Sequence, residues 1–154
     1  MEQVEERLTI SNPEELKAIS DRLSSSLHAG DVVLLEGELG AGKTAFTQML
    51  AATLGVKEKV ASPTFTVEAR YILEKGVARE LIHIDLYRLA PLSPNTEDSL
   101  YIQELFANAP TQEQIIVIEW ADRLGSIRPP SYWHLLFEHG SQEGTRTVTI
   151  SRYA

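Results

Sequence analysis

Residues 37–44 read GELGAGKT and match in full the pattern G-x-x-x-x-G-K-[ST]. Glycines let successive backbone N–H groups turn toward phosphate oxygens with no Cβ in the way, and a helix that follows aims its positive end at the same anion. A lysine places a charge beside the β- and γ-phosphates, and a threonine hydroxyl is a hard oxygen ligand for Mg²⁺. The motif therefore predicts a nucleoside triphosphate site built from Gly37, Glu38, Leu39, Gly40, Ala41, Gly42, Lys43 and Thr44. Kinases, GTPases and motors share this motif, so it does not identify the reaction.

Two acids end apolar runs and are candidates for the metal and the water. Asp85 ends LIHID, and Glu119 ends QIIVIE. An enzyme of this type needs a second acid near the phosphates to hold Mg²⁺. The order of motif, helix, threonine-containing loop, hairpin and acid parallels the GTPase switch arrangement, which favours Asp85 for the metal and Thr64 as the γ-phosphate sensor. Glu119 is then free to orient the attacking water or to contact the residues that bind the metal. A plain strand-end cap is the alternative for Asp85.

Residues beside these acids have open roles. Trp120 follows Glu119 directly and either stacks on a base, gates the site or packs in the core. His83 shares one face of an alternating strand with Asp85, and Arg88 either stabilises phosphate charge, binds a partner or is solvated. No lysine is followed two residues later by aspartate, as the guanine-reading motif of GTPases requires, so ATP is the favoured nucleotide.

The surrounding pattern predicts the elements that must position these residues. A buried strand over 31–37 precedes the motif, and a helix follows it until Gly55. The other predicted elements are a strand at 3–10, a helix from Asn12 to Gly30, hairpins at 66–86 and 132–151, helical pieces within 90–113 and a strand at 114–120. Because strands and helices interleave without a boundary, we expect one domain over 1–154, an α/β fold with a mixed sheet flanked by helices.

Composition narrows the class of protein. The 154 residues include 22 acidic and 14 basic side chains, and this acidic balance counts against broad binding of nucleic acid. Cysteine is absent, and the spacing of the four histidines does not suggest a metal cluster. No apolar run approaches the roughly 18 residues of a membrane span, and the acidic N-terminus lacks the features of a signal peptide, so a cytoplasmic location is expected.

Four segments together resemble one family. GELGAGKT, SPTF at 62–65, HIDLYRL at 83–89 and IEWADRL at 118–124 occur in the order and near the spacings of the TsaE family, bacterial ATPases of tRNA threonylcarbamoyladenosine biosynthesis. The resemblance spans 37–124. It implies a small phosphate-loop (P-loop) ATPase that binds and hydrolyses Mg-ATP and supports the transferase subunits TsaD and TsaB. The tRNA would be reached through those partners.

The resemblance also assigns roles to individual residues. It implies that Lys43, Asp85 and Glu119 are catalytic, that Thr44 and Asp85 hold the metal, and that Thr64 and Trp120 join the 37–44 segment around the nucleotide. Two other readings stay open. A small-molecule kinase would need a lid, for which Arg123 and Arg128 are candidates, although 121–131 is short and stopped by prolines. A binding module would use ATP only to switch its affinity for a protein.

Overall fold

The computed structural model describes residues 3–38, 40–60, 68–74 and 76–154. The helices are α1 (Pro13–Ser24), α2 (Lys43–Leu54) and α3 (Glu97–Gln112), with a short 3-10 helix η1 (Ala121–Leu124). The strands are β1 (Gln3–Ile10), β2 (Val32–Gly37), β3 (Glu68–Ile72), β4 (Glu80–Asp85), β5 (Gln114–Glu119), β6 (Tyr132–His139) and β7 (Arg146–Tyr153). Leu39 and Thr64 lie outside the described residues. In the described ranges, no helix is long and apolar enough to cross a membrane.

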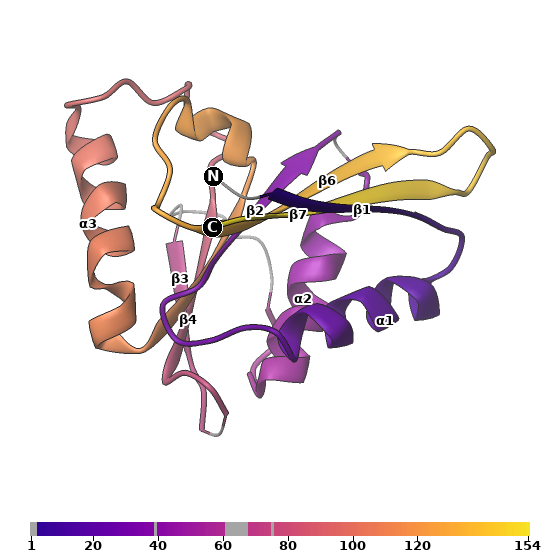
Figure 1. Cartoon of the computed structure of the whole chain (residues 1–154), viewed down its shortest axis with the longest axis horizontal. Coiled ribbons are helices and arrows are strands. Elements are labelled where there is room, and N and C mark those ends of the chain that lie inside the picture. Colours follow the sequence, from indigo (N-terminus) through magenta and orange to yellow (C-terminus); the bar gives the residue numbers. More distant parts are fainter. Residues whose placement is uncertain (1–2, 39, 61–67, 75) are drawn as a thin grey trace.

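All the strands form one mixed sheet, as the sequence predicted (Figure 1). It has seven strands in the order β1-β7-β6-β2-β5-β4-β3. The four central strands β6, β2, β5 and β4 are parallel neighbours, while β3, β7 and β1 join antiparallel. Carboxyl ends of parallel strands meet at one edge of a sheet, so the ends of β2, β5 and β4 lie together there.

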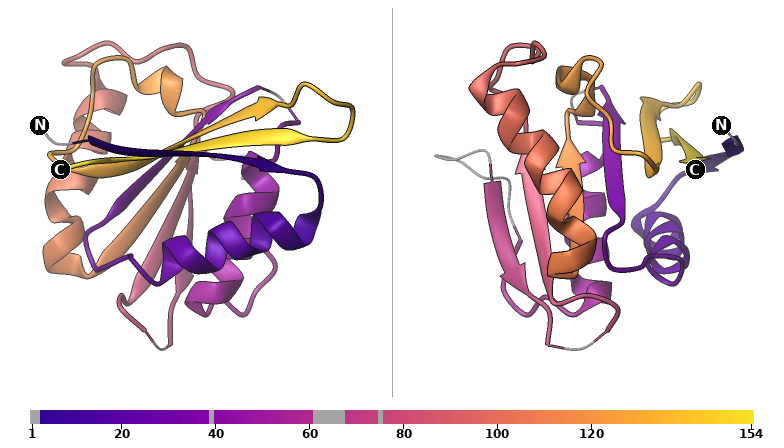
Figure 2. Two further views of the ribbon diagram at one scale, coloured as in Figure 1. Left: turned by 45° about the vertical axis from the view of Figure 1, so that its right-hand side comes forward. Right: turned by 60° about the vertical axis from the view of Figure 1, so that its left-hand side comes forward.

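The sheet is covered on both faces, with α3 on one face and α1 and α2 on the other (Figures 1 and 2). Side chains of the central strands alternate between the two cores. In β2, Val33 and Leu35 join the core beneath α2, while Val32 and Leu34 join the core beneath α3. Continuous apolar runs follow from burial on both faces, and each fully buried side chain contributes about 1.5–3 kcal/mol. Odd-numbered positions of β4 and β5 point to the α2 side, and this places their terminal acids beside the 37–44 segment.

The first helix begins as predicted but ends earlier. The Asn12 side chain accepts a hydrogen bond from the backbone N–H of Glu15 at 2.9 Å, which is an N-cap. The prediction that Gly30 ends the helix was wrong, because α1 stops at Ser24. The hydroxyls of Ser24 and Ser25 donate to backbone carbonyls three residues earlier, and such bonds compete with helical continuation.

Within the polar 90–113 segment the sequence predicted several helical pieces. The structure has one helix there, α3, over Glu97–Gln112. Thr96 caps α3 by accepting from the N–H of Ser99 at 3.2 Å. Glu97 and Asp98 occupy the first turn, where their charges complement the helix dipole. These two acids therefore stabilise the start of the helix.

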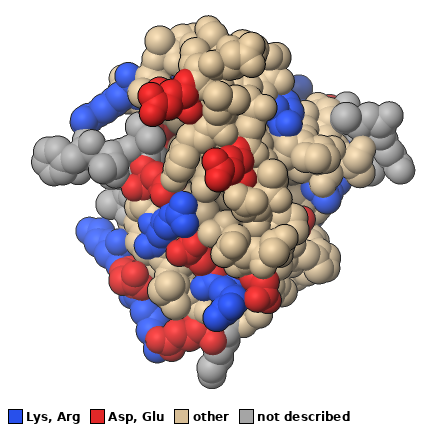
Figure 3. Space-filling model, turned by 90° about the vertical axis from the view of Figure 1, so that its left-hand side faces the viewer, with Lys and Arg blue, Asp and Glu red and all other residues tan. Residues whose placement is uncertain are grey.

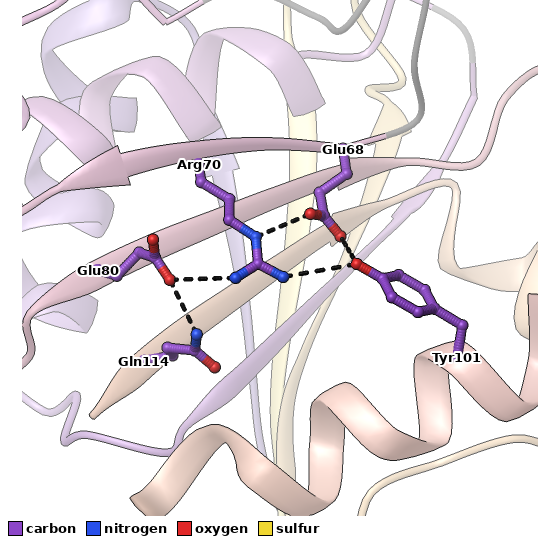
Figure 4. A network of polar contacts seen from close by, with 5 residues as sticks. All are labelled: Glu68, Arg70, Glu80, Tyr101 and Gln114. Carbon is purple, nitrogen blue, oxygen red and sulfur yellow. Dashed lines mark hydrogen bonds and ion pairs between the residues drawn. The ribbon is translucent and has the colours of Figure 1, made fainter. Parts of the chain in front are cut away.

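A polar network that the sequence analysis missed ties the edge hairpin to α3 and β5 (Figure 4). Arg70 on β3 donates to Glu68 at 2.8 Å and to Glu80 on β4 at 3.4 Å. The Tyr101 hydroxyl donates to Glu68 at 2.7 Å, and Gln114 donates to Glu80 at 2.8 Å. The hydrogen bond to Glu68 raises the pKa of Tyr101. We interpret the network as structural, because its members pair with one another.

Candidate nucleotide site

The 37–44 segment, called the glycine loop below, joins the end of central strand β2 to the start of α2, as its motif requires. At its first residue the backbone passes close to β6. A Cβ on Gly37 would lie 2.0 Å from the carbonyl oxygen of Phe137, so no other residue fits. The next N–H, of Glu38, donates to that same oxygen at 3.3 Å. Thus β6 fixes the point where the loop leaves the sheet.

Lys43 turns back into the glycine loop. Its side chain is only 4% exposed, and its Nζ donates to the carbonyls of Gly37 at 2.7 Å and Glu38 at 2.8 Å. Burial lowers the pKa of the Lys43 ammonium, against the attraction of nearby acids of which Glu119 is the strongest. The ammonium therefore lies beside the position that the motif predicts for the phosphate oxygens. In this structure the carbonyls of the loop accept its hydrogen bonds.

Glu119 joins Thr44 and His83 in a buried cluster. Its carboxylate is 1% exposed, and Oε1 accepts from the Thr44 hydroxyl at 2.8 Å. Its Oε2 lies 2.6 Å from Nε2 of His83, which is fully buried. An ionised carboxylate only accepts, so Nε2–H donates, and the buried Nδ1 has no hydrogen-bond partner in the described part of the chain. The sequence predicted that His83 shares a strand face with Asp85. The parallel pairing of β4 with β5 brings His83 into contact with Glu119.

Asp85 lies opposite Glu119 in the register of β4 and β5, one strand farther from the glycine loop. Its Oδ1 accepts from the N–H of Tyr87 at 2.9 Å, the turn contact typical of a strand-end cap. Burial raises the pKa of Asp85, and the like charge of Glu119 adds to this. The capping alternative is thus present in the structure. The metal-binding role stays a prediction, as does the sensor role of Thr64, which lies outside the described residues.

Trp120 directly follows Glu119, and its ring lies beside Lys43. Its backbone is left-handed at φ 59°, an unusual conformation for a bulky residue. The ring centroid lies 4.2 Å from Nζ of Lys43 and 4.9 Å from the Tyr87 ring. The ring also packs against the core beneath α3. Trp120 therefore packs against the core, which was one of the sequence interpretations, and it also contacts the lysine. Stacking on a base and gating of the site stay predictions.

The donor set fits a magnesium ion held partly by phosphates. Mg²⁺ prefers octahedral oxygen ligands and commonly combines one or two protein oxygens with phosphates and waters. In the described part of the chain, no group of three or more His, Asp or Glu side chains could hold a metal alone. The histidines near carboxylates form separate pairs instead, namely His28 with Asp31, His83 with Glu119, His134 with Glu36 and His139 with Glu38. Hydrogen bonding to His134 lowers the pKa of Glu36.

Comparison with known proteins finds relatives that match most of the chain. The family described as "Threonylcarbamoyl adenosine biosynthesis protein TsaE" matches residues 10–148. A protein of Nostoc sp. named "tRNA threonylcarbamoyladenosine biosynthesis protein TsaE" is 37% identical over 131 residues, covering 85% of this chain and 76% of its own. A Bacillus subtilis protein of the same name is 35% identical over 145 residues, covering 92% and 85%.

A solved structure shows the same fold. The crystal structure of YdiB from Bacillus subtilis superposes with a TM-score of 0.72 at 26% identity, covering 100% of this chain and 89% of that one. The predicted fold class, a mixed α/β sheet of the phosphate-loop type, is confirmed. The glycine loop, the cluster around Glu119 and Trp120 all fall within the matched residues.

Proposed function

The chain belongs to the TsaE family, and we propose on that premise that it is an ATPase supporting the formation of N6-threonylcarbamoyladenosine in tRNA. One observation carries the proposal. Lys43 and Thr44 of the glycine loop converge with Glu119, a buried acid at the end of the neighbouring strand. A phosphate-binding loop beside a catalytic acid is the minimum for nucleotide hydrolysis.

In this proposal ATP binds with its phosphates in the glycine loop. Phosphate oxygens replace the Gly37 and Glu38 carbonyls as acceptors for Lys43, so the ammonium exchanges one set of oxygen partners for another. The N-terminus of α2 faces the same anion and adds its dipole. Trp120 lies against the lysine and is positioned to cover the bound phosphates or stack on the base, while Thr64 senses the γ-phosphate.

Thr44 and Asp85 are proposed to hold Mg²⁺ together with phosphate oxygens and water. The ion would neutralise charge on the phosphates. Glu119 either orients the attacking water or supports the metal ligands. Its contact with the Thr44 hydroxyl puts it close enough for either task. His83 donates to the other oxygen of Glu119 and fixes the plane of the carboxylate.

The partners in this proposal are the transferase subunits TsaD and TsaB, with tRNA bound mainly through them in the cytoplasm. The charge of the chain supports an indirect contact with tRNA. Its formal net charge is −8, and on the face shown in Figure 3 acidic and basic side chains are intermixed. Phosphate backbones are gripped by continuous basic surfaces, which this face does not present.

The test is ATP turnover by the purified chain during titration with the TsaD–TsaB pair, beside a Lys43→Ala variant. We expect turnover to rise and saturate with the pair, and to be lost in the variant. Undiminished turnover in Lys43→Ala would overturn the assigned site. A rate that the pair does not change would break the link to tRNA modification and leave a nucleotide-binding protein with another role.

A further inference from the structure

The hairpin of β6 and β7 runs alongside the glycine loop. Phe137 on β6 contacts the loop at Gly37 and accepts from the N–H of Glu38. Arg146, the first residue of β7, donates from Nη2 to the carbonyl oxygen of Gly40 at 3.0 Å. The backbone of Phe137 and the side chain of Arg146 thus reach the loop from β6 and β7, although the sequence motifs stop at 124.

The Arg146 side chain has a fixed path to that carbonyl. Arg146 lies opposite His139 on β6 and Ile10 on β1, so strands flank it on both sides. Its Cδ lies 3.9 Å from the place a Cβ of Gly42 would take, and its Nε is buried with no hydrogen-bond partner in the described part of the chain. A packed stem and a planar fork leave the guanidinium little freedom.

The carbonyl that Arg146 holds belongs to a peptide that packing does not fix. Gly40 has φ +74°, and nothing lies within 4 Å of the place where its Cβ would be. Glycine passes readily between such backbone states. In a trans peptide the carbonyl and the following N–H point in opposite directions. Because Arg146 binds the Gly40 oxygen, the N–H of Ala41 points away from Arg146 and into the loop.

That N–H already takes part in a hydrogen bond inside the loop. Ala41 N–H donates to the carbonyl of Glu38 at 3.2 Å, and this same oxygen accepts from Lys43 at 2.8 Å. The amide and the ammonium therefore share one acceptor inside the loop. We propose that Arg146 is a positioning residue of the nucleotide site, which keeps the Gly40–Ala41 peptide oriented so that the Ala41 N–H can donate to a phosphate oxygen.

This inference rests on the proposed function, since it assumes that the loop's acceptor is replaced by nucleotide phosphate. Arg146 acts through the backbone and before any chemistry. It should therefore strengthen nucleotide binding and leave the hydrolytic step unchanged. A hydrogen bond from a charged guanidinium is about twice as strong as a neutral one, which makes it an effective brace for a glycine peptide.

The matched test uses two arginines of β7. Arg146→Met keeps the aliphatic stem and removes the donors. Arg152→Met is the control, because Arg152 is also partly buried with a buried unpartnered nitrogen, but stacks over Trp133 at 5.1 Å. We expect Arg146→Met to raise the Kd and KM for Mg-ATP about tenfold with kcat within about twofold, and Arg152→Met to change neither by more than twofold. Arg146→Lys should recover most of the affinity, because its ammonium can still donate to the carbonyl.

A second measurement needs no nucleotide. Amide hydrogen exchange at Ala41, followed by NMR on the free protein, should accelerate about tenfold in Arg146→Met and stay unchanged in Arg152→Met. Unchanged exchange at Ala41, unchanged affinity, or an equal loss of affinity in the control would each overturn the role of Arg146. If exchange accelerates as expected but the unaltered chain binds no ATP, the proposed function is wrong. The conclusion that Arg146 orients the Gly40–Ala41 peptide would still hold.

Discussion

The carboxyl ends of β2, β5 and β4, here called the central end, and the strands β6, β7 and β1, here called the wing, differ in the side chains that they bury. Three buried ionisable groups, Lys43, His83 and Glu119, lie together at the central end. Among the wing residues whose burial the structure describes, the buried polar side chains are the neutral Thr147 and Ser151. Removing ionisable groups from water costs free energy unless each is paired. The buried ionisable groups of the central end therefore add little to the free energy of unfolding and serve to position charge. The wing stabilises the fold through apolar packing and holds the backbone in place.

This difference predicts a division of effects. A buried ion pair is weak evidence for stability, because desolvation offsets its attraction. Conservative changes at the central end should alter turnover far more than the free energy of unfolding. Changes in the wing core should do the reverse. The predictions below test this division between turnover and stability. A reversed outcome in any of them would contradict the division.

The largest expected effect is that of Glu119→Gln. The variant keeps the side-chain size, and its amide oxygen can still accept from Thr44, but the negative charge is lost. We expect turnover in the presence of TsaD–TsaB to fall about 1,000-fold, or about 4 kcal/mol of barrier, with Mg-ATP affinity within a few fold. Steady-state kinetics and calorimetric titration measure the two quantities. Turnover within tenfold of the original chain would remove Glu119 from the proposed chemistry.

The wing counterpart is Leu135→Ala. Leu135 lies on β6, is fully buried and belongs to the core beneath α2. Truncation removes apolar contacts and leaves a cavity, so we expect a loss of about 3 kcal/mol in the free energy of unfolding, measured in urea. Turnover at a temperature where the variant is folded should stay within about twofold. A large loss of turnover in the folded variant would show that wing packing and chemistry are coupled.

A smaller effect is expected at His83, which supports Glu119 from β4. His83→Leu removes the donor to Oε2, and kcat should fall about tenfold while KM changes little. His83→Gln retains an amide donor near the position of Nε2 and should recover part of kcat. A merely structural role for the imidazole predicts equal losses in both variants. Kinetics beside melting temperatures distinguish the two cases.

Much of the fold could be predicted from sequence because its signals are local. The apolar run before Gly37, the helix stop at Gly55 and the cap at Asn12 each depend on neighbouring residues, and each prediction was confirmed. The end of α1 was missed because hydroxyls of the serine run bond to the backbone, a competition that hydrophobic periodicity does not reveal. The network around Arg70 joins residues from different elements and leaves no local pattern.

The sequence predicted which residues belong to the candidate site. It did not predict which of their side chains contact one another. Sequence placed acids at strand ends, but strand order decides that Glu119, on the neighbour of β2, contacts Thr44 while Asp85 lies one strand away. The same order pairs His83 with Glu119. Arg146 was invisible for a similar reason, since only sheet pairing brings the start of β7 to the glycine loop. Strand order is a property of the whole chain, which no single segment specifies.

The smallest expected effect on stability concerns Asp85, at the carboxyl end of β4. Burial raises the pKa of Asp85 above its ordinary value of 3.8, so the ionised carboxylate is less stable in the folded chain than in the unfolded one. Asp85→Asn removes this penalty and can still accept from the Tyr87 N–H. We expect the free protein to become slightly more stable at neutral pH, while turnover falls because a proposed metal ligand is lost.

The pH dependence fixes the sign of this last prediction. Because the folded pKa is raised, the folded chain holds the Asp85 proton more tightly than the unfolded chain, and the penalty is complete only above the folded pKa. As pH falls through the folded pKa toward 3.8, the advantage of Asp85→Asn should shrink and vanish. Melting temperatures of both proteins between about pH 4 and pH 8 measure the difference. An advantage that grows on acidification would mean that the Tyr87 hydrogen bond outweighs burial, and Asp85 would then be a structural cap like Asn12 and Thr96.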